Sequence, residues 1–216
     1  MAIIPEQDKS IIKSRLTKLK KAVKIICFLK KYGCEQCQAV RELISELETL
    51  STQLSFSIYD IEKDSNVALR FEVDMAPALL VITGTTSRIR FYGLPGGFQT
   101  ESFLEAIEMI GNERTDLHPR TVAQLNKIQQ PIHIQVFVNT KCPYCPSDVI
   151  MGHRLASASE KITSEMIDIT AFPDLVNRYN VHGVPRVVIN DTHYFEGVLP
   201  EDLYLEEVMN AITVES

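Results

Sequence analysis

The sequence predicts an α/β protein of two tandem units, each a central mixed sheet flanked by helices. The composition, with 45% hydrophobic and 23% charged residues, is that of a globular chain with a buried core. The chain also matches itself when it is shifted by 108 residues. Four positions then coincide without a gap: Cys34 with Cys142, Cys37 with Cys145, Asp60 with Asp168, and Pro77 with Pro185. We therefore expect one domain over residues 1–116 and a second over 117–216.

In the first unit, apolar runs indicate strands, and apolar residues three or four positions apart indicate helices. A strand at 23–29 leads into Cys34-Glu35-Gln36-Cys37, and the apolar residues from Val40 to Leu50 mark one face of the helix that follows. The rest of the unit is predicted as a strand at 54–60, a short helix at 66–72, a hairpin of 78–83 and 88–92 after Pro77, and a helix at 100–110.

The second unit repeats this pattern with a tighter hairpin. Its predicted elements are a strand at 132–138, the motif Cys142-Pro143-Tyr144-Cys145, a helix to about 158, a strand at 162–168, a helix at 173–179, the hairpin after Pro185, and a helix at 201–212. Additional helices are expected at 8–20 and 119–129, one before each unit. Asp60 and Asp168 fall at strand ends, where an aspartate usually caps a turn.

The charge pattern disfavours several classes of partner. The formal net charge is −6, which makes a nucleic-acid-binding function a poor prediction because such proteins must neutralise phosphates. The chain has no run of eighteen apolar residues, and its N-terminal residues do not resemble a secretory signal. We therefore expect a cytoplasmic protein that binds neither a membrane nor nucleic acid.

The cysteines indicate thiol chemistry. Four of the five form two C-x-x-C pairs, each placed between a predicted strand and a predicted helix. The free N–H groups at a helix N-terminus stabilise a thiolate, and a second thiol one helical turn away can resolve a mixed disulfide. Cys34 and Cys142 are therefore predicted to attack, and Cys37 and Cys145 to resolve. Cys27 lies inside a predicted strand and is expected to be a buried core residue.

These motifs resemble those of a known family. Cys-Pro-Tyr-Cys after an apolar strand is similar to a glutaredoxin active site, and Pro77 and Pro185 resemble the cis-proline of the thioredoxin fold. With Phe91-Tyr92-Gly93-Leu94-Pro95-Gly96-Gly97 in the first unit, the whole chain resembles the protein disulfide oxidoreductases of thermophilic prokaryotes. The resemblance implies that both prolines are cis, and that the backbones of Ala76 and Val184 pair with an extended substrate segment.

The resemblance also implies an activity. It implies oxidase, reductase and isomerase capability on protein substrates that carry thiols or disulfides, without a bound cofactor or metal. By analogy, a thioredoxin-reductase-like protein would donate the electrons. The sequence departs from thioredoxins in one respect, because the strand before each motif contains no acidic residue.

The two motifs are not expected to be equivalent. Glu35 beside Cys34 disfavours a thiolate, whereas Lys141 before Cys142 favours one. The first pair should therefore be the more reducing, by ~30 mV if the thiol pKa values differ by one unit. Pro143 and Tyr144 are further candidates for tuning the second pair, and His182 could act on Cys142 as a nearby cation.

Two alternatives remain open at this point. Four cysteines can build a zinc or iron–sulfur site, although zinc ribbons usually separate their pairs by a short segment. The chain could also be a non-catalytic protein that uses the same fold to bind clients.

Overall fold

The computed structural model describes residues 3–84 and 86–213. The first unit contains α1 (Glu6–Leu16), β1 (Val23–Leu29), α2 (Cys37–Leu50), β2 (Leu54–Asp60), α3 (Ser65–Arg70), β3 (Ala78–Thr83), β4 (Thr86–Tyr92) and α4 (Gln99–Asn112). The second contains α5 (Pro119–Leu125), β5 (Ile132–Val138), α6 (Cys145–Ala158), β6 (Ile162–Asp168), α7 (Pro173–Arg178), β7 (Arg186–Ile189), β8 (His193–Glu196) and α8 (Glu201–Thr213).

The predicted elements are present, with differences at their ends. The two additional helices are shorter than expected, α1 ending at Leu16 and α5 at Leu125. After α1 the chain turns, and the amide of Lys21 donates a hydrogen bond of 3.0 Å to the carbonyl of Gly111 at the end of α4. This contact ties the segment after α1 to the end of α4, directly before β1 begins at Val23.

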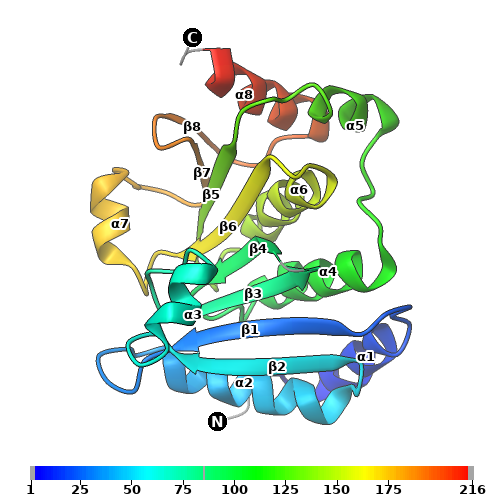
Figure 1. Ribbon diagram of the computed structural model, residues 1–216, viewed down its shortest axis with the longest axis vertical. Helices are drawn as coiled ribbons and strands as arrows, with labels where there is room; N and C mark the ends of the chain where they lie inside the picture. The colour runs from blue at the N-terminus through cyan, green and yellow to red at the C-terminus, as the bar shows by residue number, and fades with distance from the viewer. Residues whose placement is uncertain (1–2, 85, 214–216) are drawn as a thin grey trace.

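The strands form one continuous sheet in the order β2-β1-β3-β4-β6-β5-β7-β8 (Figure 1). Within each unit, the first two strands pair in parallel and the hairpin strands pair antiparallel. The units join through parallel pairing of β4 with β6, from Ile89 opposite Ser164 to Tyr92 opposite Ile167. The fold class is therefore confirmed, while the joining of the two sheets into one was outside what the repeat predicted. The division into two domains at residue 116 stays a prediction.

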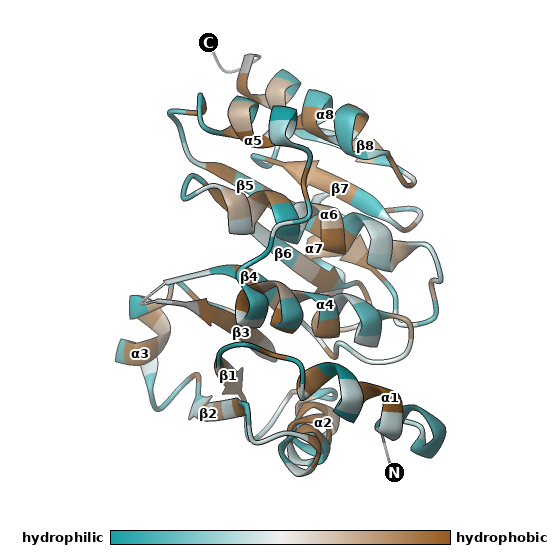
Figure 2. Ribbon diagram, turned by 90° about the vertical axis from the view of Figure 1, so that its right-hand side faces the viewer, coloured by the Kyte–Doolittle hydropathy of each residue, from teal (hydrophilic) through white to brown (hydrophobic). Residues whose placement is uncertain are grey.

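Hydrophobic residues form a core on each face of the sheet, and much of β1 and β3 is brown in the hydropathy colouring of Figure 2. The larger core lies between the sheet and α1, α2, α4, α5, α6 and α8, and the smaller one lies under α3 and α7. The alternation of side chains along β1 shows the division, because Ile25 and Cys27 enter the larger core and Ile26 and Phe28 the smaller. Both motifs follow strands buried on two faces, which holds the backbone before each first cysteine in place.

Contacts between α4 and α6 strengthen the junction on the helical face. Glu105 of α4 accepts a hydrogen bond of 3.1 Å from Arg154 of α6. The ring of Phe91 in β4 packs edge-on against His153, with ring centroids 4.8 Å apart. The two units therefore share core packing as well as strand pairing.

Candidate active site: two disulfide centres

Each C-x-x-C motif lies where a strand gives way to a helix, with its second cysteine as the first residue of α2 or α6. The pairs Cys34–Cys37 and Cys142–Cys145 are both disulfide-bonded, with Cα–Cα distances of 5.4 and 5.6 Å. In both pairs the first cysteine is partly exposed and the second is buried. This difference in access supports the assignment of attacking and resolving roles, which stays a prediction.

Both repeated prolines follow a cis peptide bond, and in the second unit the segment before the proline lies beside the cysteine pair. The bonds Ala76–Pro77 and Val184–Pro185 are both cis. The Sγ atom of Cys142 is 3.9 Å from the carbonyl oxygen of Val184. The backbone before the second proline thus lies beside the first cysteine of the second pair.

The residues predicted to tune the centres lie at the surface. Glu35, Lys141 and Pro143 are exposed, and Tyr144 has 69% of its surface accessible. His182 is exposed as well. Charges in such positions act through solvent, so their effect on a thiol is small and salt-dependent.

Gln36, inside the first motif, makes contacts that sequence reasoning missed. Its Nε2 donates hydrogen bonds to Asp168 Oδ2 at 2.8 Å and to Thr170 Oγ1 at 2.9 Å. Both acceptors belong to the other unit: Asp168 is the last residue of β6, and Thr170 lies two residues after it. Its Oε1 accepts a bond of 2.6 Å from the Leu94 amide. No local pattern signals these bonds, because Gln36 and Asp168 are 132 residues apart.

Asp148 is a second residue that sequence reasoning missed. It lies in α6 three positions after Cys145, and both residues are fully buried. Burial raises the pKa of Asp148 to about 7, and the Leu199 amide offsets part of that effect. An acidic residue on the apolar face of the helix was the available signal. The position equivalent to Asp148 in the first unit is Val40, which is buried in the core.

Cys27 and the two repeated aspartates are placed as predicted. Cys27 is a free, buried cysteine, and burial raises the pKa of its thiol well above the ordinary value. Asp60 Oδ1 accepts hydrogen bonds from the amides of Glu62 and Lys63. Asp168 caps its own turn by accepting from the Thr170 amide at 3.0 Å, in addition to its bond with Gln36.

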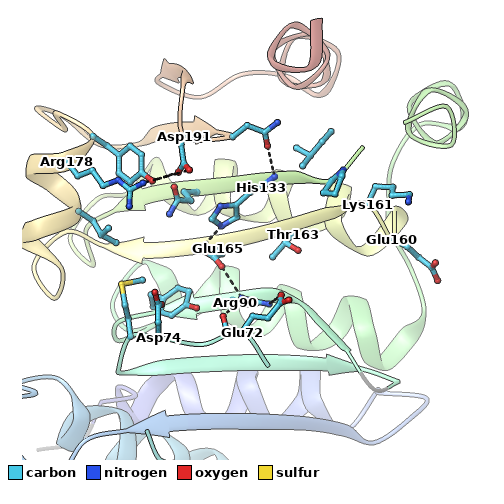
Figure 3. A pocket seen from close by; sticks show the side chains of 18 residues that line it. Glu72, Asp74, Arg90, His133, Glu160, Lys161, Thr163, Glu165, Arg178 and Asp191 are labelled. Atoms are coloured by element: carbon cyan, nitrogen blue, oxygen red, sulfur yellow. Dashed lines mark hydrogen bonds and ion pairs between the residues drawn. The ribbon is translucent and has the colours of Figure 1, made fainter. Parts of the chain in front are cut away.

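A polar cavity of about 800 Å³ lies elsewhere, on the face of the sheet near the junction of the units (Figure 3). Glu165 of β6 is at its centre, 3.3 Å from Arg90 of β4 and 2.8 Å from the ring of His133 of β5. Burial lowers the pKa of His133, but the hydrogen bond and charge of Glu165 outweigh burial and leave the pKa raised. None of the four motif cysteines lines this cavity.

Two features are absent from the described residues: a cluster of metal-ligating side chains and a helix that could span a membrane. Across residues 3–84 and 86–213, no three His, Cys, Asp or Glu side chains gather as a metal site requires. A four-cysteine zinc or iron–sulfur site would need the two pairs to meet. In the same part of the chain, no helix combines the length and apolar character that crossing a membrane requires.

Comparison with known proteins agrees with this geometry. The thioredoxin domain family matches residues 132–210. A crystal structure of a protein disulfide oxidoreductase from Aeropyrum pernix superposes with a TM-score of 0.89 and 27% identity, over 96% of this chain and 93% of that one. The alkyl hydroperoxide reductase AhpF of Enterococcus faecalis superposes at 0.87 with 22% identity, over 95% of this chain and 99% of that one.

Among curated proteins, the AhpF protein of Escherichia coli is 26% identical over 191 residues, 88% of this chain and 34% of that protein. The AhpF protein of Staphylococcus aureus strain Mu50 is 26% identical over 164 residues, 76% of this chain and 30% of that protein. The chain thus spans about a third of the length of these relatives.

Fold and site together define a tandem thioredoxin-fold protein with two dithiol–disulfide centres. The predicted resemblance to the protein disulfide oxidoreductases is confirmed by the Aeropyrum pernix structure.

Proposed function

We propose that the chain is a protein dithiol–disulfide oxidoreductase that uses both C-x-x-C centres to reduce, form and rearrange disulfides in protein substrates. The observation that carries this proposal is the same in both units: an accessible first cysteine, a buried second cysteine, and a cis-proline segment in the same unit. A general client-binding protein would not need this arrangement twice.

In the reductive direction, the thiolate of Cys34 or Cys142 attacks a substrate disulfide, forms a mixed disulfide and releases one substrate thiolate. The thiolate of Cys37 or Cys145 then attacks the mixed disulfide, which closes the enzyme disulfide and releases the second substrate thiolate. Two electrons pass to the substrate, whose two sulfurs take up two protons. The reverse sequence forms a substrate disulfide.

The remaining roles belong to the same proposal. The backbones of Ala76 and Val184 would pair with an extended substrate segment, as a strand adds to a sheet edge. Val184 supports this because its carbonyl oxygen lies 3.9 Å from Cys142 Sγ. A thioredoxin-reductase-like protein is proposed as the electron donor. The cytoplasmic location stays a prediction, which fractionation of cells with a specific antibody would check.

Similarity to the AhpF proteins favours a second candidate function, in which the reduced chain passes its electrons towards the reduction of alkyl hydroperoxides. The supporting observation is that the similarity to the Escherichia coli protein extends over 88% of this chain. Reoxidation of the reduced chain by an alkyl hydroperoxide, alone and with a hydroperoxide-reducing protein from the same cells, separates the two functions.

The decisive experiment is turnover of disulfides by the purified chain, with insulin reduction and reactivation of scrambled ribonuclease as assays. We expect Cys142→Ser to lower both rates by about tenfold or more, because it removes the attacking thiol of the second centre. Cys34→Ser should lower them less, and the double variant should be inactive. Cys27→Ala, which removes the remaining thiol without placing a hydroxyl in the apolar core, is the matched control and should keep full activity.

Intact mass measured after alkylation completes the test. The native chain should be metal-free and should show the four motif cysteines as alkylation sites only after dithiothreitol treatment. A bound zinc or cluster lost on denaturation, together with wild-type rates in the double variant, would refute the proposal.

A further inference from the structure

The side chain of Gln36 joins the first motif to the second unit. Its amide donates to a carboxylate oxygen of Asp168, which is 1% exposed, and to the hydroxyl of Thr170. That hydroxyl in turn donates to the other oxygen of Asp168 at 2.8 Å. Hydrogen bonds to a carboxylate are stronger than neutral ones, and burial of Asp168 shields this bond from water.

The loop at 93–98 forms a second connection between the motifs. Near its start, the amide of Leu94 donates to Gln36 at 2.6 Å. At its end, the amide of Phe98 donates to the carbonyl of Thr140, two residues before Cys142, at 3.0 Å. A Cβ at Gly97 would lie only 2.4 Å from that Thr140 carbonyl oxygen, so the loop packs against the second motif at backbone distance.

The equivalent positions of the repeat show that these contacts belong to the first motif alone. Tyr144 occupies the place of Gln36 and is 69% exposed. A Cβ added at Gly93 would lie 2.5 Å from Asp168 Cβ, whereas one added at the equivalent Gly197 would meet nothing within 4 Å. The first motif therefore contacts the other unit through Gln36 and the loop at 93–98, while the equivalent positions of the second motif, Tyr144 and Gly197, do not make such contacts.

We propose that Gln36 is a positioning residue for the Cys34–Cys37 centre, and that its bond to Asp168 lets the second unit stabilise the disulfide form of that centre. Gln36 lies between the two cysteines, so the disulfide holds the turn that aims its amide at Asp168. Reduction opens the S–S bond and frees the turn, which weakens the bonds that Gln36 makes. This inference deepens the proposed function, because it names how one of its two centres is regulated.

The test is the equilibrium between each disulfide and dithiothreitol in the full-length chain. Reduction breaks the enzyme S–S bond and adds two electrons and two protons, which the two thiols of dithiothreitol lose as they close into a cyclic disulfide. Acid quenching, alkylation and mass spectrometry of the separate peptides give the reduced fraction of each pair. For Gln36→Leu we expect the reduction equilibrium of Cys34–Cys37 to shift about fivefold towards the dithiol, which corresponds to about 20 mV.

The repeat supplies the controls. Tyr144→Leu changes the same position of the second motif and should leave the Cys34–Cys37 equilibrium unchanged. Asp168→Asn should shift it in the same direction but less, and Asp60→Asn should not shift it. The double variant Gln36→Leu with Asp168→Asn should shift the Cys34–Cys37 equilibrium by less than the sum of the two single shifts, because both substitutions remove the same interaction.

An unchanged equilibrium in Gln36→Leu, or an equal shift in Tyr144→Leu, would overturn the inference. If Gln36→Leu does not fold, judged by circular dichroism, Asp168→Asn and its control Asp60→Asn decide the question. The proposed function is tested separately, because both pairs can be titrated in a chain that reduces no insulin. Normal insulin reduction with no effect of Gln36→Leu would refute only the inference.

Discussion

The helices that follow the two motifs differ more in their surroundings than in their backbone. Val40 and Ile44 of α2 are buried in a hydrophobic core, with Phe56 of β2 packed against it. The equivalent residues of the second unit are Asp148, Gly152 and Ser164, all buried. The repeat thus preserves the strand, motif and helix while the chemistry beneath the helix has diverged. Two centres of the same geometry therefore need not have the same proton or electron affinity.

The largest expected effect concerns the buried carboxyl of Asp148. The pKa of Asp148 is about 7 in the folded chain, against an ordinary value of 3.8. The folded state therefore binds this proton more tightly than the unfolded state, and the resulting stability is present below pH 4 and lost as the pH rises towards 7. We expect the free energy of unfolding of Asp148→Asn, relative to that of wild type, to rise by up to about 4 kcal/mol between pH 4 and pH 8.

Urea unfolding of both proteins across this pH range measures the difference. Comparison with wild type is needed because burial lowers the pKa of nearby His153 to about 3, which gives wild-type stability the opposite pH dependence. The exposed Asp202→Asn is the control and should follow wild type. If the two proteins differ in free energy of unfolding by the same amount at every pH, the pKa of Asp148 is not raised in the folded chain, and this contrast between the units is wrong.

A smaller effect is expected from the paired glycines. Gly93 and Gly197 have φ angles of 108° and 82°, so alanine is strained at both. Only at Gly93 does the added Cβ also collide with Asp168 of the other unit. We expect Gly93→Ala to be less stable than Gly197→Ala by about 2 kcal/mol, the usual cost of overpacking. Equal urea midpoints for the two variants would show that Gly93 is no more tightly packed against the other unit than Gly197 is.

The smallest effect concerns the exposed charges beside the attacking cysteines. The first pair should be more reducing than the second in low salt, by up to about 30 mV, the value for a one-unit difference in thiol pKa, because Glu35 disfavours and Lys141 favours a thiolate. The double variant Glu35→Gln with Lys141→Gln should narrow this difference, as should 1 M salt, which screens exposed charges. If the difference in reduction potential persists in the double variant and in 1 M salt, it arises from buried contacts such as that of Gln36.

Much of the fold follows from local pattern. The strands at 23–29, 54–60, 132–138 and 162–168 have the predicted bounds. A nearly continuous apolar run identifies 23–29, which is buried on both faces, whereas alternating apolar residues identify 54–60, an edge strand that is only partly buried. Helix ends were less accurate, as α1 and α5 show, because the apolar periodicity that marks a helix continues past the residue where the helix ends. Burial of Cys27 also followed from its place inside an apolar strand.

The sequence by itself determined the two units, their cysteine pairs and the prolines that accompany them, because spacing along the chain sets which residues meet at a strand–helix junction. Tertiary structure alone decided that β4 pairs with β6, that Gln36 bonds to Asp168, and that Asp148 is buried without a charged partner. These contacts join residues far apart in sequence, and their energy depends on enclosure from water, which no local pattern specifies.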